Sequence, residues 1–322
     1  MRLQKCSTML LLIILLIPSL APAGQTKEND KHGFFGSILL SAGVTASKPS
    51  GLTVTDDNKK IDTLHDRADR QNRIIPLILG EFGYSFAATG TRISLSNQKS
   101  EKSFADLVVE QPLKNLGTLR ASFGYGKQDA WANPYLTGVK RSETDEASYN
   151  MKLEWEQIAG SGFFATLKLS SIDVDQDLIG EMYQDLKRDG QIMAAETGYA
   201  FSVGKNQMII PGFDIEVEDR DGESNASKKF GVSVSHVIDV HKWHFITSLG
   251  MGRREFDKAH PIFHETRKET QYELSHLVTY SSPFGFKGWF INGLAAYSRT
   301  DANIDFFKQD ELIIGAGIGY EF

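Results

Sequence analysis

The chain has 322 residues, with 41% hydrophobic and 24% charged side chains, which suits a soluble domain and a transmembrane β-barrel equally. Its formal charge of −6 and its pI of about 5.8 argue against a nucleic-acid partner. Because Cys6 is the only cysteine, the chain cannot form an internal disulfide.

The N-terminal residues have the pattern of a secretory signal peptide. Arg2 and Lys5 precede an unbroken apolar run of nine residues, and small residues follow up to Ala23. The run is about half the ~20 residues that a membrane-spanning helix needs. We therefore predict a signal peptide over residues 1–23, cleaved after Ala23, and a single barrel domain over residues 24–322.

Apolar and polar residues alternate along most of the remaining chain, which is the pattern of half-buried β-strands. Each apolar stretch is too short for a membrane-spanning helix, so a membrane location would require a closed barrel. In chain order, the predicted strand windows are 33–47, 73–88, 91–98, 103–111, 117–127, 146–157, 162–174, 190–203, 207–219, 227–239, 242–256, 267–281, 288–300 and 309–322.

Two of these windows, 91–98 and 103–111, are short. With them the sequence predicts an all-β fold, a transmembrane antiparallel up-and-down β-barrel of about fourteen strands. Without them the count becomes twelve, which is also even, as in bacterial single-chain barrels.

The predicted connections alternate in length along the chain. Those after even-numbered strands are tight turns rich in Gly, Asn and Ser, whereas the longest ones, 48–72, 128–145 and 176–189, follow odd-numbered strands. Short periplasmic turns and long outer loops are typical of outer-membrane barrels, so we place both termini in the periplasm.

One long connection, 176–189, has the spacing of a short helix. Leu178, Met182 and Leu186 would lie on one side of it. The segment could fold into the lumen as a constriction, but a solvated outer loop is the favoured interpretation.

Charged residues fall on the strand face opposite to the apolar one, which would line the lumen. Acidic residues outnumber basic ones there, which predicts a mild cation preference if the lumen is open. Ion pairing across a closed lumen is the alternative, and the sequence leaves both open. The predicted lumen-facing residues are Arg92, Arg120, Lys152, Lys168, Arg254, Glu81, Asp106, Glu110, Glu154, Glu156, Glu196, Asp214, Glu216, Glu218 and Glu273.

We predict no enzyme activity, and neither a catalytic, a cofactor nor a metal site. Ser275 adjoins His276, but alternation sends the two side chains to opposite faces, so they cannot act as nucleophile and base. Two histidine pairs have metal-like spacing but lie outside any predicted helix, and they are interpreted as surface turn residues. These pairs are His241 with His244, and His260 with His264.

The last predicted strand ends in an aromatic residue preceded by apolar residues at every second position. Ile318, Tyr320 and Phe322 share one face, and this pattern resembles the C-terminal assembly signal of outer-membrane barrels. The opposite face carries Gly315 and two further glycines at a spacing of two, interpreted as small lumen-facing residues. We expect the barrel-assembly machinery to bind this strand.

Several short motifs lie mostly in the predicted connections and at strand ends. They are Trp131-Ala132-Asn133-Pro134-Tyr135, Thr144-Asp145-Glu146, Arg254-Glu255-Phe256-Asp257, Pro261-Ile262-Phe263, Thr266-Arg267, Pro283-Phe284-Gly285 and Asn303-Ile304-Asp305-Phe306. These motifs resemble a family of proteobacterial outer-membrane proteins, the domain of unknown function 2860. The resemblance covers nearly all of the mature chain and implies an outer-membrane β-barrel, but no established activity.

A fainter resemblance concerns the C-terminal hairpin alone. Residues 283–322 are similar to the terminal hairpin of surface-lipoprotein assembly modifier barrels. Those proteins carry a helical repeat domain before the barrel, which this sequence lacks.

The function that the sequence favours is a porin-like passive channel for small polar or cationic solutes. One alternative is a plugged barrel with a protein-handling role, such as surface lipoprotein assembly. Another is a structural or adhesive surface protein acting through the loop at 48–72. The expected partners are outer-membrane lipids, the assembly machinery and small-solute cargo; no nucleic acid and no cofactor is expected.

Overall fold

A computed structural model describes residues 32–65, 69–97 and 103–322; the predicted signal peptide, residues 1–23, lies outside them. Its strands are β1 (Gly33–Lys48), β2 (Gln71–Ser85), β3 (Arg92–Ser96), β4 (Ala105–Pro112), β5 (Thr118–Trp131), β6 (Glu143–Glu156), β7 (Phe163–Val174), β8 (Gly190–Tyr199), β9 (Phe201–Ser202), β10 (Gln207–Arg220), β11 (Ser227–Val240), β12 (Trp243–Ala259), β13 (Thr266–Ser281), β14 (Trp289–Ala302) and β15 (Gln309–Glu321).

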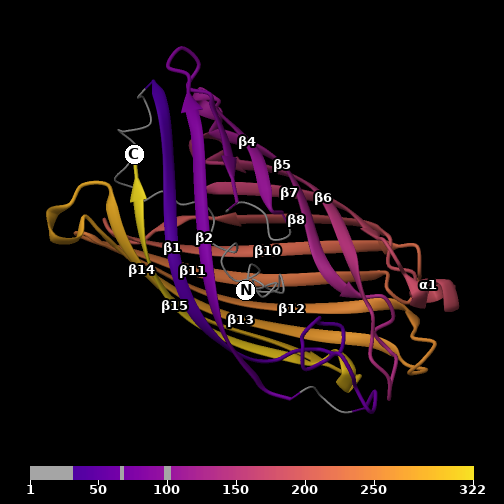
Figure 1. The fold of residues 1–322 in the computed structure, drawn as a ribbon. Helices are drawn as coiled ribbons and strands as arrows, with labels where there is room; N and C mark the ends of the chain where they lie inside the picture. The colour runs from indigo at the N-terminus through magenta and orange to yellow at the C-terminus, as the bar shows by residue number, and fades with distance from the viewer. Residues whose placement is uncertain (1–31, 66–68, 98–102) are drawn as a thin grey trace.

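The strands form one closed antiparallel barrel (Figure 1). The segments β8 and β9 both pair with β10 and are two parts of one strand interrupted at Ala200, so the described residues form fourteen strands. The ring closes where β1 pairs with β15, from Ser37 opposite Glu321 to Lys48 opposite Asp310. The prediction of about fourteen strands is confirmed.

The two short strands that the sequence left in doubt are both present. The strand β3 pairs with β2 from Arg92 opposite Ser85, and β4 pairs with β5 from Pro112 opposite Thr118. The twelve-strand alternative is therefore wrong.

The two ends of the barrel differ in the length of their connections. Tight turns join the strands at the short-turn end, where β1 begins and where the amide of Gly36 donates to the carbonyl of Phe322 at 3.0 Å. One turn requires a glycine, because Gly117 has φ +97° and a Cβ there would lie 2.1 Å from the Glu156 carbonyl oxygen. The longer connections lie at the opposite, long-loop end (Figure 1).

Helices occur only as short segments of the connections within the described residues. The tight turns hold η2 (Lys114–Leu116), η3 (Ile158–Gly160) and η5 (Pro283–Gly285), and the long connections hold α1 (Leu178–Met182), η4 (Gln184–Leu186) and η6 (Asp305–Phe307). In this part of the chain no helix has the length and apolar character needed to cross a membrane.

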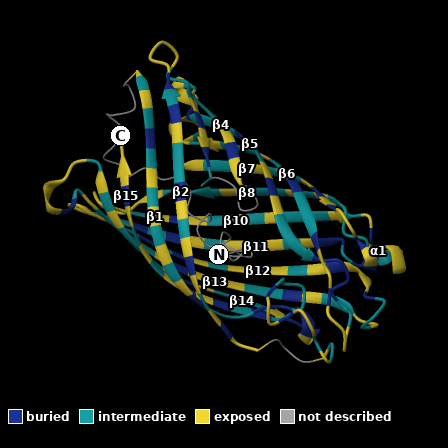
Figure 2. Cartoon of the chain, in the orientation of Figure 1, coloured by how far each residue is buried: buried dark blue, intermediate teal, exposed yellow. Residues whose placement is uncertain are grey.

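The outer face of the barrel is apolar. Along β1 and β2, exposed side chains such as Phe34, Ile74 and Ile78 alternate with less exposed ones, as Figure 2 shows. Ile74 is 77% exposed, an arrangement that is unfavourable in water and suits contact with lipid. Aromatic residues such as Trp243 and Trp289 lie at the short-turn ends of their strands, where barrels place an interfacial girdle. The fold is that of an outer-membrane β-barrel.

Candidate functional site

The inner face carries two clusters of ion pairs. The first lies on β4, β5 and β6, where the guanidinium of Arg120 is 2.8 Å from Glu110, 3.1 Å from Glu156 and 3.7 Å from Glu154. Lys152 adds a further pair with Glu154 at 3.2 Å. The side chain of Arg120 is only 9% exposed, so the three carboxylates stabilise a charge that has lost most of its water.

The second cluster lies on β10, β12 and β13. Arg254 is 2.5 Å from Glu216, 2.9 Å from Glu218 and 3.9 Å from Glu269. Arg267 forms a second ion pair with Glu269. Each cluster thus has one buried arginine among three glutamates, which lie on the adjacent strands in the first cluster and on an adjacent strand and the next but one in the second.

Of the other predicted lumen residues, Lys168, Glu196 and Asp214 lie between or beside these clusters. Glu196 and Asp214 are direct cross-strand partners, and so are Lys152 and Lys168. Asp214 also pairs with Lys229 at 3.4 Å. Strand register places Glu273 apart from both clusters, opposite Gly250 on β12 and Ser298 on β14.

Four charged residues of this arrangement were not predicted, namely Arg220, Lys229, Arg267 and Glu269. Lys229 and Glu269 have the alternation phase of the polar face of their strands, so the same rule would have found them, whereas Arg220 lies one residue beyond its predicted strand window. Arg267 stood at the edge of its strand window, where the phase is least certain.

Several inner-face side chains keep contact with solvent. Glu216 is 23% exposed, and Asp214 is 30% exposed. These residues alternate with lipid-facing positions, so the space that they reach is the lumen. The lumen beside the clusters is therefore wide enough to hydrate charged groups.

The long connections contact one another across the mouth of the long-loop end. The hydroxyl of Tyr135, in the β5–β6 connection, lies 3.0 Å from Nε2 of His260 in the β12–β13 connection. Its ring also lies 5.1 Å from that of Phe306, in the β14–β15 connection. Around the described ring, six strands separate Tyr135 from His260 on one side and eight on the other. Residues from nearly opposite walls thus meet, and we call this assembly the loop cap.

The loop cap has an apolar core of its own. Buried Ile304, Phe306 and Phe307 pack together with the end of β14, and Phe263 and Tyr135 pack against them. Leu52, Ile61 and Leu64 of the β1–β2 connection complete the cluster. Three motifs of the family resemblance, around Tyr135, Phe263 and Phe306, therefore meet at one place.

The β1–β2 connection is fixed to the cap by polar contacts to β5 and the β5–β6 connection. Arg141 is 4% exposed and donates to the carbonyl oxygens of Gly51 and Pro134, each at 2.8 Å, and of Asn58 at 2.9 Å. Its guanidinium also lies 4.3 Å from the ring of Trp131. Burial lowers the pKa of Arg141 to about 10, which still leaves it charged at neutral pH.

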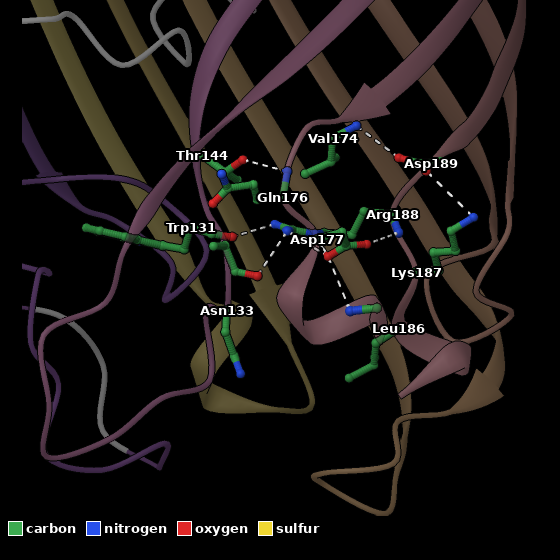
Figure 3. A network of polar contacts seen from close by, with 12 residues as sticks. Trp131, Asn133, Thr144, Val174, Gln176, Asp177, Leu186, Lys187, Arg188 and Asp189 are labelled. Carbon is green, nitrogen blue, oxygen red and sulfur yellow. Dashed lines mark hydrogen bonds and ion pairs between the residues drawn. The ribbon is translucent and has the colours of Figure 1, made fainter. Parts of the chain in front are cut away.

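The β7–β8 connection joins the cap through Asp177 and Arg188 (Figure 3). Arg188 donates through Nε to the Asp177 carboxylate at 2.8 Å and through Nη1 to the carbonyl of Trp131 at 2.7 Å. Asp177 caps α1 by accepting from the amide of Gly180. The interpretation of 176–189 as a solvated loop holds only in part, because residues 181–184 are exposed while Asp177, Ile179 and Leu186 are buried.

The predicted apolar side of this segment is also wrong in part. The structure buries Ile179 and Leu186, whereas Leu178 and Met182 are exposed. The helix spans only five residues and a separate turn, η4, follows it, so helical spacing does not extend as far as Leu186.

His260 is 2% exposed, so its interpretation as a surface turn residue is wrong. Its ring packs against Phe263 and Phe307, and burial together with Arg267 lowers the pKa of His260 to about 4. It is therefore neutral at neutral pH. Among the described residues no group of three or more potential ligands is arranged to hold a metal ion.

The predicted C-terminal signal residues lie on the outer face of the closing strand. Ile318 pairs with Leu40 of β1, and the ring of Tyr320 lies 5.3 Å from that of Trp289 on β14. The ring of Phe322 lies 6.5 Å from that of Phe82 on β2. These residues thus lie beside β1 and β14, the two strands that pair with β15, and beside β2.

Comparisons with known proteins give structural likenesses at low sequence identity, and a search of curated proteins found no match. The outer membrane channel DcaP of Acinetobacter baumannii has a TM-score of 0.46 at 10% identity, covering 90% of this chain and 96% of that one. OmpTdeltaL8, a loop L8 deletion mutant of the Vibrio cholerae outer membrane protein OmpT, has a TM-score of 0.43 at 11% identity, covering 91% of this chain and 99% of that one. An anion-selective porin from Comamonas acidovorans has a TM-score of 0.41 at 9% identity, covering 91% of this chain and 99% of that one.

The sequence match to a family covers almost the whole barrel. It extends over residues 33–321, from the first residue of β1 to the last residue of β15. The chain therefore belongs to the family described as Protein of unknown function (DUF2860).

Proposed function

We propose that this protein is a passive channel for small polar or cationic solutes in the bacterial outer membrane, with both termini in the periplasm. The observation that carries the proposal is the partly hydrated, charged inner wall, because a barrel filled by its own side chains would leave no water beside Glu216 and Asp214. Only a weak cation preference is expected, since the bases Arg120, Lys152, Arg254 and Arg267 offset four of the six carboxylates in the two clusters.

The loop cap adds a condition to this function. Solutes that enter from the long-loop end must pass the contact between Tyr135 and His260, so transport requires the cap to move or leave a side passage. We propose that the cap faces the cell exterior and limits the open time of the channel.

Single-channel recording tests the proposal. The refolded mature protein in a planar bilayer, under a salt gradient, should show discrete conductance steps and a reversal potential slightly toward that of the cation. A barrel that shows the heat-dependent gel shift of a folded barrel but never conducts would overturn the channel function.

A second candidate function rests on the same cap. A mouth closed by packed loops also suits a plugged barrel that handles proteins, such as surface lipoproteins, or a structural surface protein. Deleting the gene should then remove particular lipoproteins from the cell surface while solute uptake stays unchanged. Adhesion through the connection at 48–72 is less favoured, since Arg141 and Trp131 hold its described residues in the cap.

A further inference from the structure

One part of the inner wall is apolar instead of charged. It lies on β13, β14, β15, β1 and β2 and lines a cavity with about 610 Å³ of empty space, including the part open to solvent. The lining side chains come from five adjacent strands. They include Leu39, Ile75, Leu77, Leu79, Leu294 and Ile313.

Alternation shows that these side chains face inward. Leu39 lies between Ile38 and Leu40 on β1, and those two neighbours are 47% and 51% exposed on the lipid face. Leu77 has the same relation to Ile78 on β2, which is 62% exposed. The cavity therefore belongs to the lumen and not to the lipid contact surface.

The apolar wall continues around the barrel in strand register. Starting at β10 and following direct cross-strand partners, the row reads Met208, Val237, Ile246, Leu277, Leu294, Gly315, Gly43 and Ile75. At β10–β12 this row is packed, since Ile210, Val237 and Ile246 form a buried cluster with Leu277. At β15 and β1 two facing glycines replace large side chains, and this leaves the cavity between Leu294 and Ile75.

The polar groups of the cavity are few and uncharged. Ser41, Thr45 and Asn292 are its hydroxyl and amide side chains, and its lining includes no ionisable side chain. Ligand sites of this kind are mostly apolar with a few placed hydrogen-bonding groups.

We propose that this cavity binds an uncharged, mainly apolar small molecule, such as an alkyl chain with one hydroxyl or carbonyl group. Barrel lumens are usually polar, and the charged clusters of the other wall follow that rule, so the apolar wall calls for an apolar occupant. The proposal goes beyond the channel function by adding a site for an apolar ligand, and it rests on that function for access to the lumen.

Protection of an introduced cysteine tests the site with 1-decanol as the probe. Ser41→Cys places a thiol at the cavity, and Ser170→Cys is its matched control on the inner face of β7, across the ring. Both chains are produced without residues 1–23, so that Cys6 is absent, and refolded into lipid nanodiscs. At about ten times its Kd, decanol should slow modification by a charged methanethiosulfonate reagent about tenfold at position 41 and leave position 170 unchanged.

Adding Leu77→Asn to Ser41→Cys should remove the protection while the heat-dependent gel shift is retained. A thiol at position 41 that reacts slowly in nanodiscs without decanol, but fast after lipid-free refolding into amphipol, would identify a lipid chain as the occupant. Equal rates with and without decanol, in protein that reacts fast in both media, would overturn the site.

Conductance separates this proposal from the channel function. A protein that conducts but shows no protection retains the channel and loses the apolar site. A protein that shows protection but does not conduct retains the site and loses the channel.

Discussion

His260 connects the stability of the loop cap to pH. Its ring lies among Phe263, Phe307 and the Tyr135 hydroxyl, with Arg267 nearby, so protonation would bury a positive charge close to another one. The neutral form is the one that the folded cap accommodates.

Acid should therefore loosen the cap. The pKa of His260 is lowered to about 4 in the folded state, so its contribution is complete above the unfolded value of 6.5 and is lost as the pH falls toward 4. Between pH 6.5 and pH 4 the contribution of His260 to the stability of the cap should fall by about 3 kcal/mol. Hydrogen exchange of the amides at 260–265, corrected for the intrinsic effect of pH, should accelerate below pH 6.5.

His264 provides the control for this experiment, because it is exposed in the same connection. His264→Gln should keep the acid response, and His260→Gln should abolish it. An acid response that survives in the His260 variant would show that another group is responsible.

Removing the arginine of the first cluster should destabilise the barrel. Arg120→Met leaves Glu110, Glu154 and Glu156 without their shared guanidinium, which should lower the free energy of unfolding by about 3 kcal/mol. Urea unfolding of the protein refolded into vesicles measures the change.

Arg253→Met is the matched control for this substitution. Its ion pair with Glu255 at 2.7 Å is on the exposed outer surface, so the loss should stay within about 1 kcal/mol. Equal destabilisation by the two variants would contradict the view that the inner cluster stabilises the wall.

The last residue of the chain, next to the closing strand β15, should be needed for efficient assembly of the barrel. Phe322 forms two backbone hydrogen bonds with Gly36, each 3.0 Å long, and its ring lies near Phe82. Deleting Phe322 removes these contacts and the aromatic end of the proposed assembly signal. The fraction of heat-modifiable barrel in the outer membrane should fall severalfold.

Phe286→Ala tests whether any exposed aromatic at this end has the same effect. Phe286 is exposed in the β13–β14 turn and lies outside the closing strand, so assembly should remain normal. Undiminished assembly after loss of Phe322 would remove the support for the C-terminal signal.

The strands could be predicted from sequence because lipid and lumen impose opposite demands on alternate side chains. Even β3, with five residues, keeps exposed Ile93 and Leu95 in alternation with buried Ser94 and Ser96. The interruption at Ala200 was not predicted, since the residues on both sides continue the same pattern.

The long connections could not be predicted in the same way. Tyr135, His260 and Phe306 are far apart in sequence, and they meet only because the ring brings distant strands to one mouth. Alternation specifies the face of a residue but not its partner across the lumen. The available signal was the presence of aromatic residues in connections that would otherwise be polar.

At the scale of the whole molecule, the barrel combines a charged wall, an apolar wall and a covered mouth. Arg120 and Arg254 organise the charged wall, and the cavity beside Leu77 and Leu294 lies in the apolar wall. The cap lies at the long-loop end, away from the terminal residue Phe322 (Figure 1). We infer that the cap, and not the width of the barrel, limits passage.

Single-channel recordings of the wild type and of a trimmed variant test whether the cap limits passage. Replacing residues 52–64 by a short Gly-Ser linker removes the carbonyls of Thr53 and Asn58 that bind Trp131 and Arg141. The trimmed barrel should show longer openings and a higher mean conductance than the wild type, while Asp62→Asn, an exposed change in the same loop, should behave like the wild type. Equal conductance in the trimmed and wild-type barrels, or silence in both, would contradict the account.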